Sequence, residues 1–391
     1  MKSTLLILAV AALPLAAQHR ITNGDVKTRA ATNVAQDVKT LGSAATPVWI
    51  AYTVPSVGGS HCEGRATLED GRGSTRQENK QESTNLLVFL RAENGNVTRI
   101  RAWGEGCEID AGGRTVHLLT GVGTADSIAL MSSYATGAER KMSDAAVFVI
   151  AQHKGPEADA ALARLTEPSQ AEGLRERAVF WLGASRGRPG YERLRTIVRE
   201  DPSSHIREKA VFALHVSKEP QAADALVELA RGDKDPHVRG QALFWLGQGD
   251  DKRAMTALSY AAENDPDREV RKKAVFALSQ LKSDAGLTKL IELAKTAKDS
   301  EVRGQAIFWL GQKAQKKAVA TLSDVAENDP DTDVKKKAVF AISQLPKDDG
   351  VPKLIELART NKNGEVRKQA IFWLGQSEDP RAIDYFESLL K

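Results

Sequence analysis

Two cysteines carry the most reactive side chains of this 391-residue chain, Cys62 and Cys107. In an oxidising compartment such a pair becomes a disulfide, and closing this loop would stabilise the region by about 3 to 4 kcal/mol. The alternative is a metal site completed by His61 and His117. Neither cysteine has a second one two to four residues away, as zinc sites require. We therefore predict the disulfide Cys62–Cys107, and no metal or cofactor.

Three carboxylates near Cys107 are the other candidates for chemistry: Glu105, Glu108 and Asp110. Such groups could transfer protons or bind a cation, although a solvated charge run is the commoner explanation. The chain has no Gly-x-Ser-x-Gly elbow and no phosphate-binding loop ending in Lys-Ser/Thr. The sequence therefore predicts a protein that is not an enzyme. The alternative is an envelope hydrolase or lyase with a site between Cys107 and Arg114.

The first seventeen residues have the three parts of a secretory signal peptide. Lys2 supplies the positive charge, Leu5 to Leu15 form an apolar run, and Ala16-Ala17 offers a cleavage site before Gln18. The run is shorter than the roughly 20 residues of a membrane span, which leaves an uncleaved anchor as the alternative. We therefore expect residues 1–17 to be removed, the mature chain to have no transmembrane segment, and the protein to be periplasmic or secreted.

A repeat of 32 residues is the strongest signal in the chain, and such periods indicate a solenoid. It is marked by Phe148, Phe180, Phe212, Phe244, Phe276, Phe308, Phe340 and Phe372. The period is also doubled, because Phe-Trp-Leu-Gly alternates with Val-Phe-Ala-(Leu/Ile). Each period contains two segments with apolar residues three and four apart, as amphipathic helices require. Two short helices cannot bury their apolar faces alone, so the units must stack.

The borders of these helices are also readable. Asp-Pro pairs at 201–202, 265–266 and 329–330 predict the turns, with the aspartate as helix cap. The glycine of Phe-Trp-Leu-Gly, such as Gly311, predicts the end of the second helix. The pattern gives about eight helix pairs from about residue 125, and a last helix that caps the end.

The run Val-Arg-x-x-Ala-x-x-x-Leu-Gly, as at Val238 to Gly247 and Val302 to Gly311, resembles HEAT repeats, specifically the short phycobilisome-lyase type. The resemblance covers about residues 140–391. It implies an α-α superhelix and a ladder of acidic residues and arginines between repeats, here Asp201 with Arg207, Asp265 with Arg271, and Asp329 with Lys335. The ladder is expected to be incomplete, because Ala297 and Asn361 occupy acidic positions. The whole layout resembles secreted bacterial HEAT-repeat proteins, which implies no activity.

A helical wheel at 100° per residue predicts which side of the second helix is exposed. The recurrent aliphatic, Ala, Leu and Trp positions cluster on one buried side, and Phe falls nearly opposite, on the side that is concave in HEAT-like repeats. We therefore predict a concave, partner-binding strip made of Phe180, Phe212, Phe244, Phe276, Phe308, Phe340, Phe372, Gln248, Gln280, Gln312, Gln344, Lys272 and Lys336. Three alternatives remain: the rings pack between repeats as a spine, their sameness reflects recent duplication, or the amino-terminal domain docks on them.

Residues 18–124 do not share the period and predict a separate small α+β domain. Arg29 to Leu41 reads as a helix and Val48 to Val54 as a strand. Leu86 to Ala92 and Val97 to Trp103 flank Asn94-Gly95, which favours a hairpin, and Arg114 to Leu119 could add a strand. We expect three or four antiparallel strands, with residues 63–84 as a loop. The domains are thus 1–17, 18–124 and 125–391.

Composition limits the function further. The net charge of +4 is too small to mark a nucleic-acid-binding protein. Binding of nucleic acid by the lysines of the strip is a weaker alternative, which export makes improbable. We expect an exported, non-enzymatic interaction module or scaffold whose solenoid binds a protein or peptide on its concave face.

Overall fold

The computed structural model describes residues 21–58, 62–63, 66–69, 78–79, 84–137, 139–249, 252–313 and 315–390. The segment predicted to be a signal peptide, residues 1–17, and His61 lie outside these residues. The chain divides into two compact units, residues 1–193 and 194–391, with the border inside one helix. Each unit is described by itself. The predicted division at 124/125 into a sheet domain and a solenoid stays a prediction.

A mixed sheet forms the first part of unit 1. Its elements are β1 (Ile21–Ala30), α1 (Val34–Leu41), β2 (Val48–Pro55), β3 (Cys62–Glu63), β4 (Ala66–Thr67), β5 (Glu78–Asn79), β6 (Asn85–Glu93), β7 (Asn96–Gly104) and β8 (Ile109–Thr120). The strand order is β1-β8-β2-β6-β7, with β4 also on β8, and β3 pairs with β5 apart from this sheet. Strand β8 is parallel to β1, β2 and β4, whereas β2, β6 and β7 are antiparallel.

The sheet buries residues on both faces. One face carries Trp49, Phe89 and Val116, with Leu68 packed over them, and the Trp49 and Phe89 rings meet edge to face at 6.4 Å. The other face buries Ile50 and its neighbours, and α1 packs against β2 and β6. Because both faces are covered, β2 and β6 are apolar almost throughout.

The structure confirms the hairpin of this unit and corrects its sheet. β6 and β7 are joined at Asn94 and Gly95, both with positive φ (51° and 74°), as the Asn-Gly turn predicts. The expectation of three or four antiparallel strands is wrong, because β1 and β8 form parallel pairs. The expected helix from Arg29 is also shorter: Arg29 belongs to β1, and α1 begins only at Val34, capped by the Asn33 side chain.

Helical hairpins make up the rest of the chain. The helices are α2 (Thr124–Gly137), α3 (Arg140–Gln152), α4 (Pro156–Leu165), α5 (Glu172–Ser185), α6 (Gly187–Glu200), α7 (Ser204–Val216), α8 (Ala222–Gly232), α9 (Pro236–Gln248), α10 (Lys252–Asn264), α11 (Arg268–Gln280), α12 (Asp284–Thr296), α13 (Ser300–Lys313), η2 (Gln315–Ala318), α14 (Val319–Asn328), α15 (Thr332–Ser343), α16 (Lys347–Thr360), α17 (Gly364–Gly375) and α18 (Pro380–Leu390). The predicted α-α superhelix of about eight pairs with a final single helix is confirmed.

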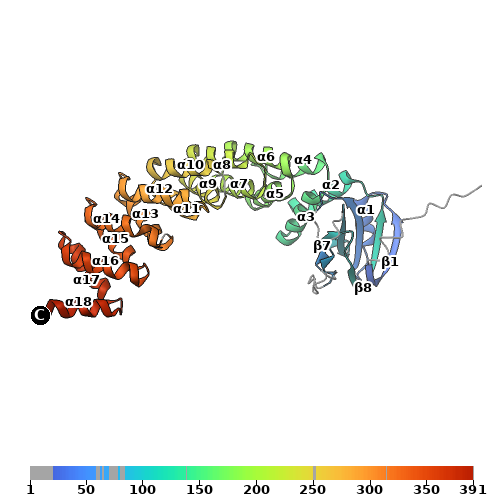
Figure 1. Ribbon diagram of the computed structural model, residues 1–391. Coiled ribbons are helices and arrows are strands. Elements are labelled where there is room, and N and C mark those ends of the chain that lie inside the picture. The colour runs from blue at the N-terminus through green and yellow to red at the C-terminus, as the bar shows by residue number, and fades with distance from the viewer. Residues whose placement is uncertain are drawn as a thin grey trace, which may run out of the picture. The chain divides into compact units, whose positions relative to one another are not determined.

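Unit 2 has two helical layers. Even-numbered helices pack on even-numbered ones and odd-numbered helices on odd-numbered ones. Figure 1 shows α9, α11 and α13 along the inner side of the curve of this unit and α8, α10 and α12 along its outer side. We call the odd-numbered helices α7 to α17 the inner helices. Each buries its recurrent aliphatic residue against its hairpin partner, for example Val270 and Val302.

The glycine of Phe-Trp-Leu-Gly ends α17, at Gly375, as predicted, but it does not end α9 or α13. Gly247 and Gly311 lie inside α9 and α13 and are buried. A Cβ on Gly247 would lie 2.8 Å from Cβ of Ala277, and one on Gly311 would lie 3.0 Å from Cβ of Ala341. These residues are glycine because the next inner helix lies too close for a side chain.

Candidate partner-binding surface on the inner helices

The turns before the inner helices set the register of the surface. Ser203, Asp235, Asp267, Asp331 and Asn363 are the N-caps, and each accepts a hydrogen bond from a backbone N–H of the first turn. The caps therefore lie two residues after the predicted aspartates of the Asp-Pro turns. Because each helix starts at the same point of the repeat, its Phe falls at the same place on the surface.

The predicted aspartates instead form a ladder with arginines, although not with the predicted partners. Arg207 donates to both carboxylate oxygens of Asp233 in the next repeat, at 2.9 and 3.0 Å. In its own turn it donates only to the backbone carbonyl of Asp201, at 2.9 Å. Within one repeat, Arg207 thus contacts the backbone carbonyl of Asp201 and not its carboxylate. The arginine–carboxylate pair, one rung of the ladder, connects neighbouring repeats.

The same rung recurs with one exception. Arg239 binds both oxygens of Asp265, Arg303 binds both oxygens of Asp329, and Arg271 reaches Asp299. Lys335, at the equivalent place, donates to the carbonyl of Glu327. The equivalent acidic position one repeat later is Asn361. The ladder is therefore incomplete at Asn361, as predicted, whereas at the other predicted gap, Ala297, Arg271 reaches Asp299 instead.

The phenylalanines of unit 2 form two sets of ring contacts with the tryptophans, one from Phe212 to Phe308 and one from Phe340 to Phe372. Trp309 lies between Phe276 and Phe308, with both centroids 5.0 Å away. Trp245 lies in the same way between Phe212 and Phe244, and Trp373 between Phe340 and Phe372. Phe244 also stacks on Phe276 at 6.2 Å. We call Phe212, Phe244, Phe276, Phe308, Phe340 and Phe372 the aromatic row.

The rings of the row pack between repeats and still reach the surface. Phe308 and Phe372 are 40% and 54% exposed, whereas the other four are half-buried. In unit 1, Phe180 is 39% exposed and contacts Trp181 at 5.1 Å. The geometry thus contains the contacts expected of a packing spine. Whether the row also binds a partner stays a prediction.

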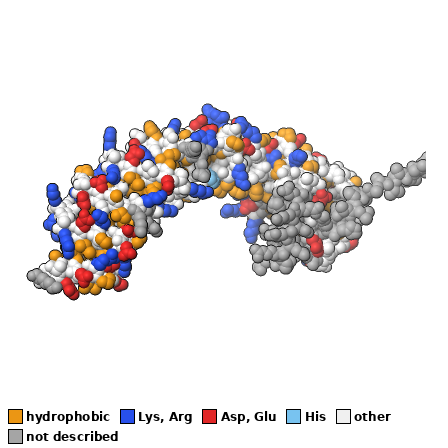
Figure 2. All heavy atoms as spheres, in the orientation of Figure 1, with side chains coloured by type: hydrophobic (Ala, Val, Ile, Leu, Met, Phe, Trp, Pro, Cys, Tyr) orange, Lys and Arg blue, Asp and Glu red, His pale blue; other side chains and the backbone are white. Residues whose placement is uncertain are grey.

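Glutamines and lysines flank the row as predicted. Gln248, Gln312 and Gln344 are exposed and Gln280 is half-buried. The predicted lysines are paired: Lys272 lies 2.9 Å from a Glu269 oxygen and Lys336 lies 3.1 Å from an Asp333 oxygen. Figure 2 accordingly shows hydrophobic and charged side chains intermixed on the visible face of unit 2.

Comparison with known families identifies the repeats. Four overlapping matches to the HEAT-repeat family cover residues 159–240, 223–311, 287–371 and 319–391, together more than half of the chain. The chain is a HEAT-repeat protein. No curated protein sequence matches it.

Several solved structures are similar to this HEAT-repeat protein at low sequence identity. Human deoxyhypusine hydroxylase is 16% identical over 65% of this chain and 97% of its own length, with a TM-score of 0.28. Kap95p, solved with RanGDP, is 15% identical over 65% of this chain and 39% of its own, with a TM-score of 0.42. The CpcE–CpcF complex of phycocyanin lyase from Nostoc is 19% identical over 64% and 94%, with a TM-score of 0.31. Enzymes and transport proteins both occur among them.

Two of the three carboxylates near Cys107, Glu105 and Asp110, accept hydrogen bonds from neighbouring amide groups. Glu105 accepts a hydrogen bond from the Asn85 amide at 2.8 Å, and Asp110 accepts from Asn23 at 2.9 Å and from the Gly112 N–H at 2.8 Å. Cys107 itself is buried. The side chain of Cys62 lies outside the described residues, so the disulfide stays a prediction. Among the described residues, no three His, Cys, Asp or Glu side chains are placed to bind a metal ion.

A buried hydrogen-bonded chain in unit 1 escaped the sequence analysis. Ser127 Oγ lies 2.9 Å from both Tyr52 Oη and His153 Nε2, and His153 Nδ1 lies 2.6 Å from the carbonyl of Val149. A Ser–His pair at this distance could act as nucleophile and base. All three side chains are fully buried, however, so no substrate reaches them. Burial lowers the pKa of His153 and raises that of Tyr52. The hydrogen bonds of Ser127 connect α2 and the end of α3 to strand β2.

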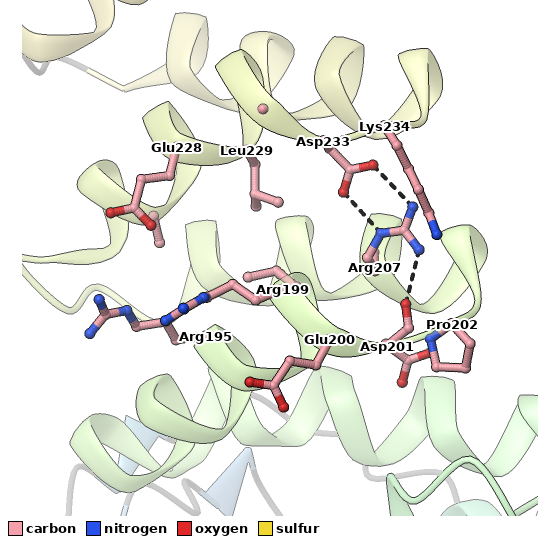
Figure 3. Close-up of a pocket in the computed structure, with 13 residues that line it drawn as sticks. Arg195, Arg199, Glu200, Asp201, Pro202, Arg207, Glu228, Leu229, Asp233 and Lys234 are labelled. Carbon is pink, nitrogen blue, oxygen red and sulfur yellow. Dashed lines mark hydrogen bonds and ion pairs between the residues drawn. The ribbon is translucent and has the colours of Figure 1, made fainter.

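A cleft of unit 2 lies between α6 and α8, in the outer layer (Figure 3). It has a volume of about 660 Å³ and an apolar floor that includes Val198 and Leu229. Its lining contains equal numbers of positive and negative side chains. The positive ones are Arg195, Arg199, Arg207 and Lys234, and the negative ones are Glu200, Asp201, Glu228 and Asp233. Its lining contains no Ser, Cys or His, and the balance of charge selects no ligand.

Proposed function

We propose that this HEAT-repeat protein is a non-enzymatic scaffold that binds a protein or peptide on the aromatic row of the inner helices. The observation that carries the proposal is the exposure of Phe308 and Phe372, 40% and 54%, on the same position of α13 and α17. Burying one phenylalanine in a partner contributes about 1.5 to 3 kcal/mol. Large exposed apolar groups that line up along one surface are typical of interaction sites.

The proposal that the protein is not an enzyme rests on the described residues. The Ser127–His153 pair is sealed from solvent, and two of the three carboxylates near Cys107 are occupied by backbone and amide donors. Within the described part of the chain, no helix has the length and apolarity to span a membrane. The alternative of a hydrolase or lyase near Cys107 to Arg114 thus gains no support from the geometry.

Export and the disulfide belong to the same proposal. The pattern of residues 1–17 supports removal before Gln18, and delivery to an oxidising compartment would join Cys62 to Cys107. Intact-mass measurement of the protein purified from the cell envelope tests both statements. We expect a chain beginning at Gln18 whose mass rises by two hydrogens on reduction, and an unprocessed or unchanged mass would refute the corresponding statement.

Peptide selection tests the binding surface directly. A displayed random-peptide library is selected on the wild-type protein, and the affinities of the selected peptides are measured by fluorescence anisotropy. Phe308→Ser and Phe372→Ser should each weaken binding about tenfold, which corresponds to about 1.4 kcal/mol. The matched control is Tyr260→Ser, because Tyr260 is an aromatic residue of α10 that is 56% exposed in the outer layer.

The outcome is judged together with circular dichroism and thermal melting of each variant. If the two Phe variants keep their helical signal and lose binding while Tyr260→Ser binds normally, the aromatic row is the site. If no peptide is selected, or Tyr260→Ser loses as much affinity as the others, the proposal fails.

A further inference from the structure

The charged residues around the aromatic row are distributed unevenly. The residue that precedes the recurrent aliphatic position is acidic in four successive inner helices: Glu269, Glu301, Asp333 and Glu365. Each of these carboxylates has a cationic partner. Glu269 and Glu301 bind Lys272, Glu301 also binds Arg268, Asp333 binds Lys336, and Glu365 binds Lys368. The acidic side of this surface is therefore neutralised.

Two lysines on the same surface lack such a partner. Lys273 and Lys337 stand three residues before Phe276 and Phe340, one helical turn away on the same face. No residue in the described part of the chain forms an ion pair with either ammonium group. Exposed ion pairs contribute little to stability, but each pair cancels one positive and one negative charge in the net charge of this surface. With the four carboxylates matched, Lys273 and Lys337 leave this face positive beside the aromatic row.

Both lysines lie close to a glycine of the preceding inner helix. A Cβ on Gly240 would lie 2.6 Å from Cδ and 3.0 Å from Nζ of Lys273. A Cβ on Gly304 would lie 2.9 Å from Cδ and 2.8 Å from Nζ of Lys337. Each lysine side chain thus lies against the neighbouring inner helix at a glycine, where an added methyl group would displace its flexible end. The same arrangement occurs twice, 64 residues apart, so the surface has two equivalent cationic positions.

We infer that the partner segment is acidic as well as apolar, with carboxylates that meet Lys273 and Lys337 while its apolar side chains cover the aromatic row. This inference rests on the proposed function and names the chemistry of its ligand. Complementary charge selects partners and speeds association. Inner helices spaced about 10 Å apart place the two lysines about 20 Å from each other. An extended chain covers that distance in about six residues.

A designed peptide serves as the probe. Its sequence is Asp-Phe-Leu-Ser-Gly-Ser-Asp-Phe-Leu, with a fluorescent label, so that its two aspartates stand six residues apart. The control peptide has lysine in place of both aspartates. Binding to the full chain is measured by anisotropy at about 0.05 M and about 0.3 M salt, which changes the screening of exposed charges.

The protein variants separate charge from packing. We expect the aspartate peptide to bind at least tenfold more tightly than the lysine peptide, and more weakly at high salt. Lys273→Gln and Lys337→Gln should each weaken its binding about three- to tenfold. The matched control Lys298→Gln removes the same charge from an exposed residue of the turn before α13 and should leave binding unchanged.

Each remaining outcome decides between the two proposals. If the aspartate peptide binds no better than the lysine peptide, or if Lys273→Gln and Lys337→Gln bind it normally, the inference is overturned. The proposed function would survive that result provided that Phe308→Ser still weakens binding of library-selected peptides. If neither the lysine nor the phenylalanine substitutions affect any peptide, both proposals fall.

Discussion

Removing one rung of the arginine–aspartate ladder should destabilise the solenoid at that repeat, and the chain contains its own control. Arg303 donates from Nε and one terminal nitrogen to the two oxygens of Asp329, at 2.7 and 3.0 Å. Its other terminal nitrogen donates to the carbonyl of Ala297 at 2.8 Å. The guanidinium and the carboxylate are 8% and 2% exposed. The ion pair raises the pKa of Arg303, so the guanidinium stays charged at any pH where the protein folds.

Arg303→Met leaves the aspartate buried without its counter-charge. Breaking a buried pair in this way costs about 3 to 5 kcal/mol. Lys335 occupies the equivalent place two helices later, but its ammonium is bound to a backbone carbonyl, and the residue 26 positions onward is Asn361 instead of an aspartate. Lys335→Met should therefore cost about 0.5 kcal/mol or less, as for ordinary surface substitutions.

Native-state hydrogen exchange is the appropriate assay, because repeat arrays open locally and need not unfold in two states. Amides of α13 to α15 should exchange about 10²- to 10⁴-fold faster in Arg303→Met, the equivalent of about 3 to 5 kcal/mol. The same amides in Lys335→Met should exchange within about threefold of wild type. Equal effects of the two substitutions, or a change below tenfold in Arg303→Met, would refute the ladder as a source of stability.

Two further predictions concern packing and protonation. Gly247→Ala should destabilise the array by about 1 to 3 kcal/mol in urea unfolding, because its Cβ would lie 2.8 Å from Cβ of Ala277. The control Gly375→Ala, whose Cβ would have no atom within 4 Å, should be neutral or stabilising. Equal effects of the two substitutions would contradict the close approach of the helices at Gly247. His153 has a pKa below its ordinary value, so the unfolded chain binds more protons than the folded one. Stability of unit 1 should therefore be full above about pH 6.5 and fall below it by up to about 1.4 kcal/mol per pH unit. Hydrogen exchange of β2 amides at pH 7.5 and 5.5 measures this, and an unchanged pH dependence in His153→Gln would show that another group is responsible.

The sequence was sufficient for whatever depends on local periodicity. The 32-residue spacing of the phenylalanines predicts the inner helices and their register, and Asn94-Gly95 predicts the hairpin between β6 and β7. Both signals are short in range, since one helix face or one turn contains all the residues that produce them. The same holds for the partial exposure of Phe308 and Phe372, which follows from the wheel of a single helix.

What the sequence did not predict depends on neighbours far along the chain. β1 is polar over most of its length, and it forms its pairs with β8, almost 90 residues later, so its pattern alone did not identify a strand. The arginines of the ladder reach carboxylates about one repeat onward, a displacement that only the stacking of hairpins defines. The Tyr52–Ser127–His153 chain joins residues from a strand and two helices that share no motif.

The doubled period has a physical explanation in two alternating kinds of helix interface. Where a Phe-Trp-Leu-Gly helix follows a Val-Phe-Ala helix, tryptophan packs on the preceding phenylalanine, as Trp309 does on Phe276. Where the order is reversed, alanine stands in place of tryptophan and packs on the preceding glycine, as Ala341 does on Gly311. The wheel of one helix placed tryptophan on the buried side because it ignores this contact between successive helices. The unpaired lysines belong to the second kind of interface, since the glycines that make room for them occur in the same helices. A partner that binds both lysines therefore contacts one of them in every second repeat. The packing of the inner helices thus also sets the spacing of the unpaired charges on this surface.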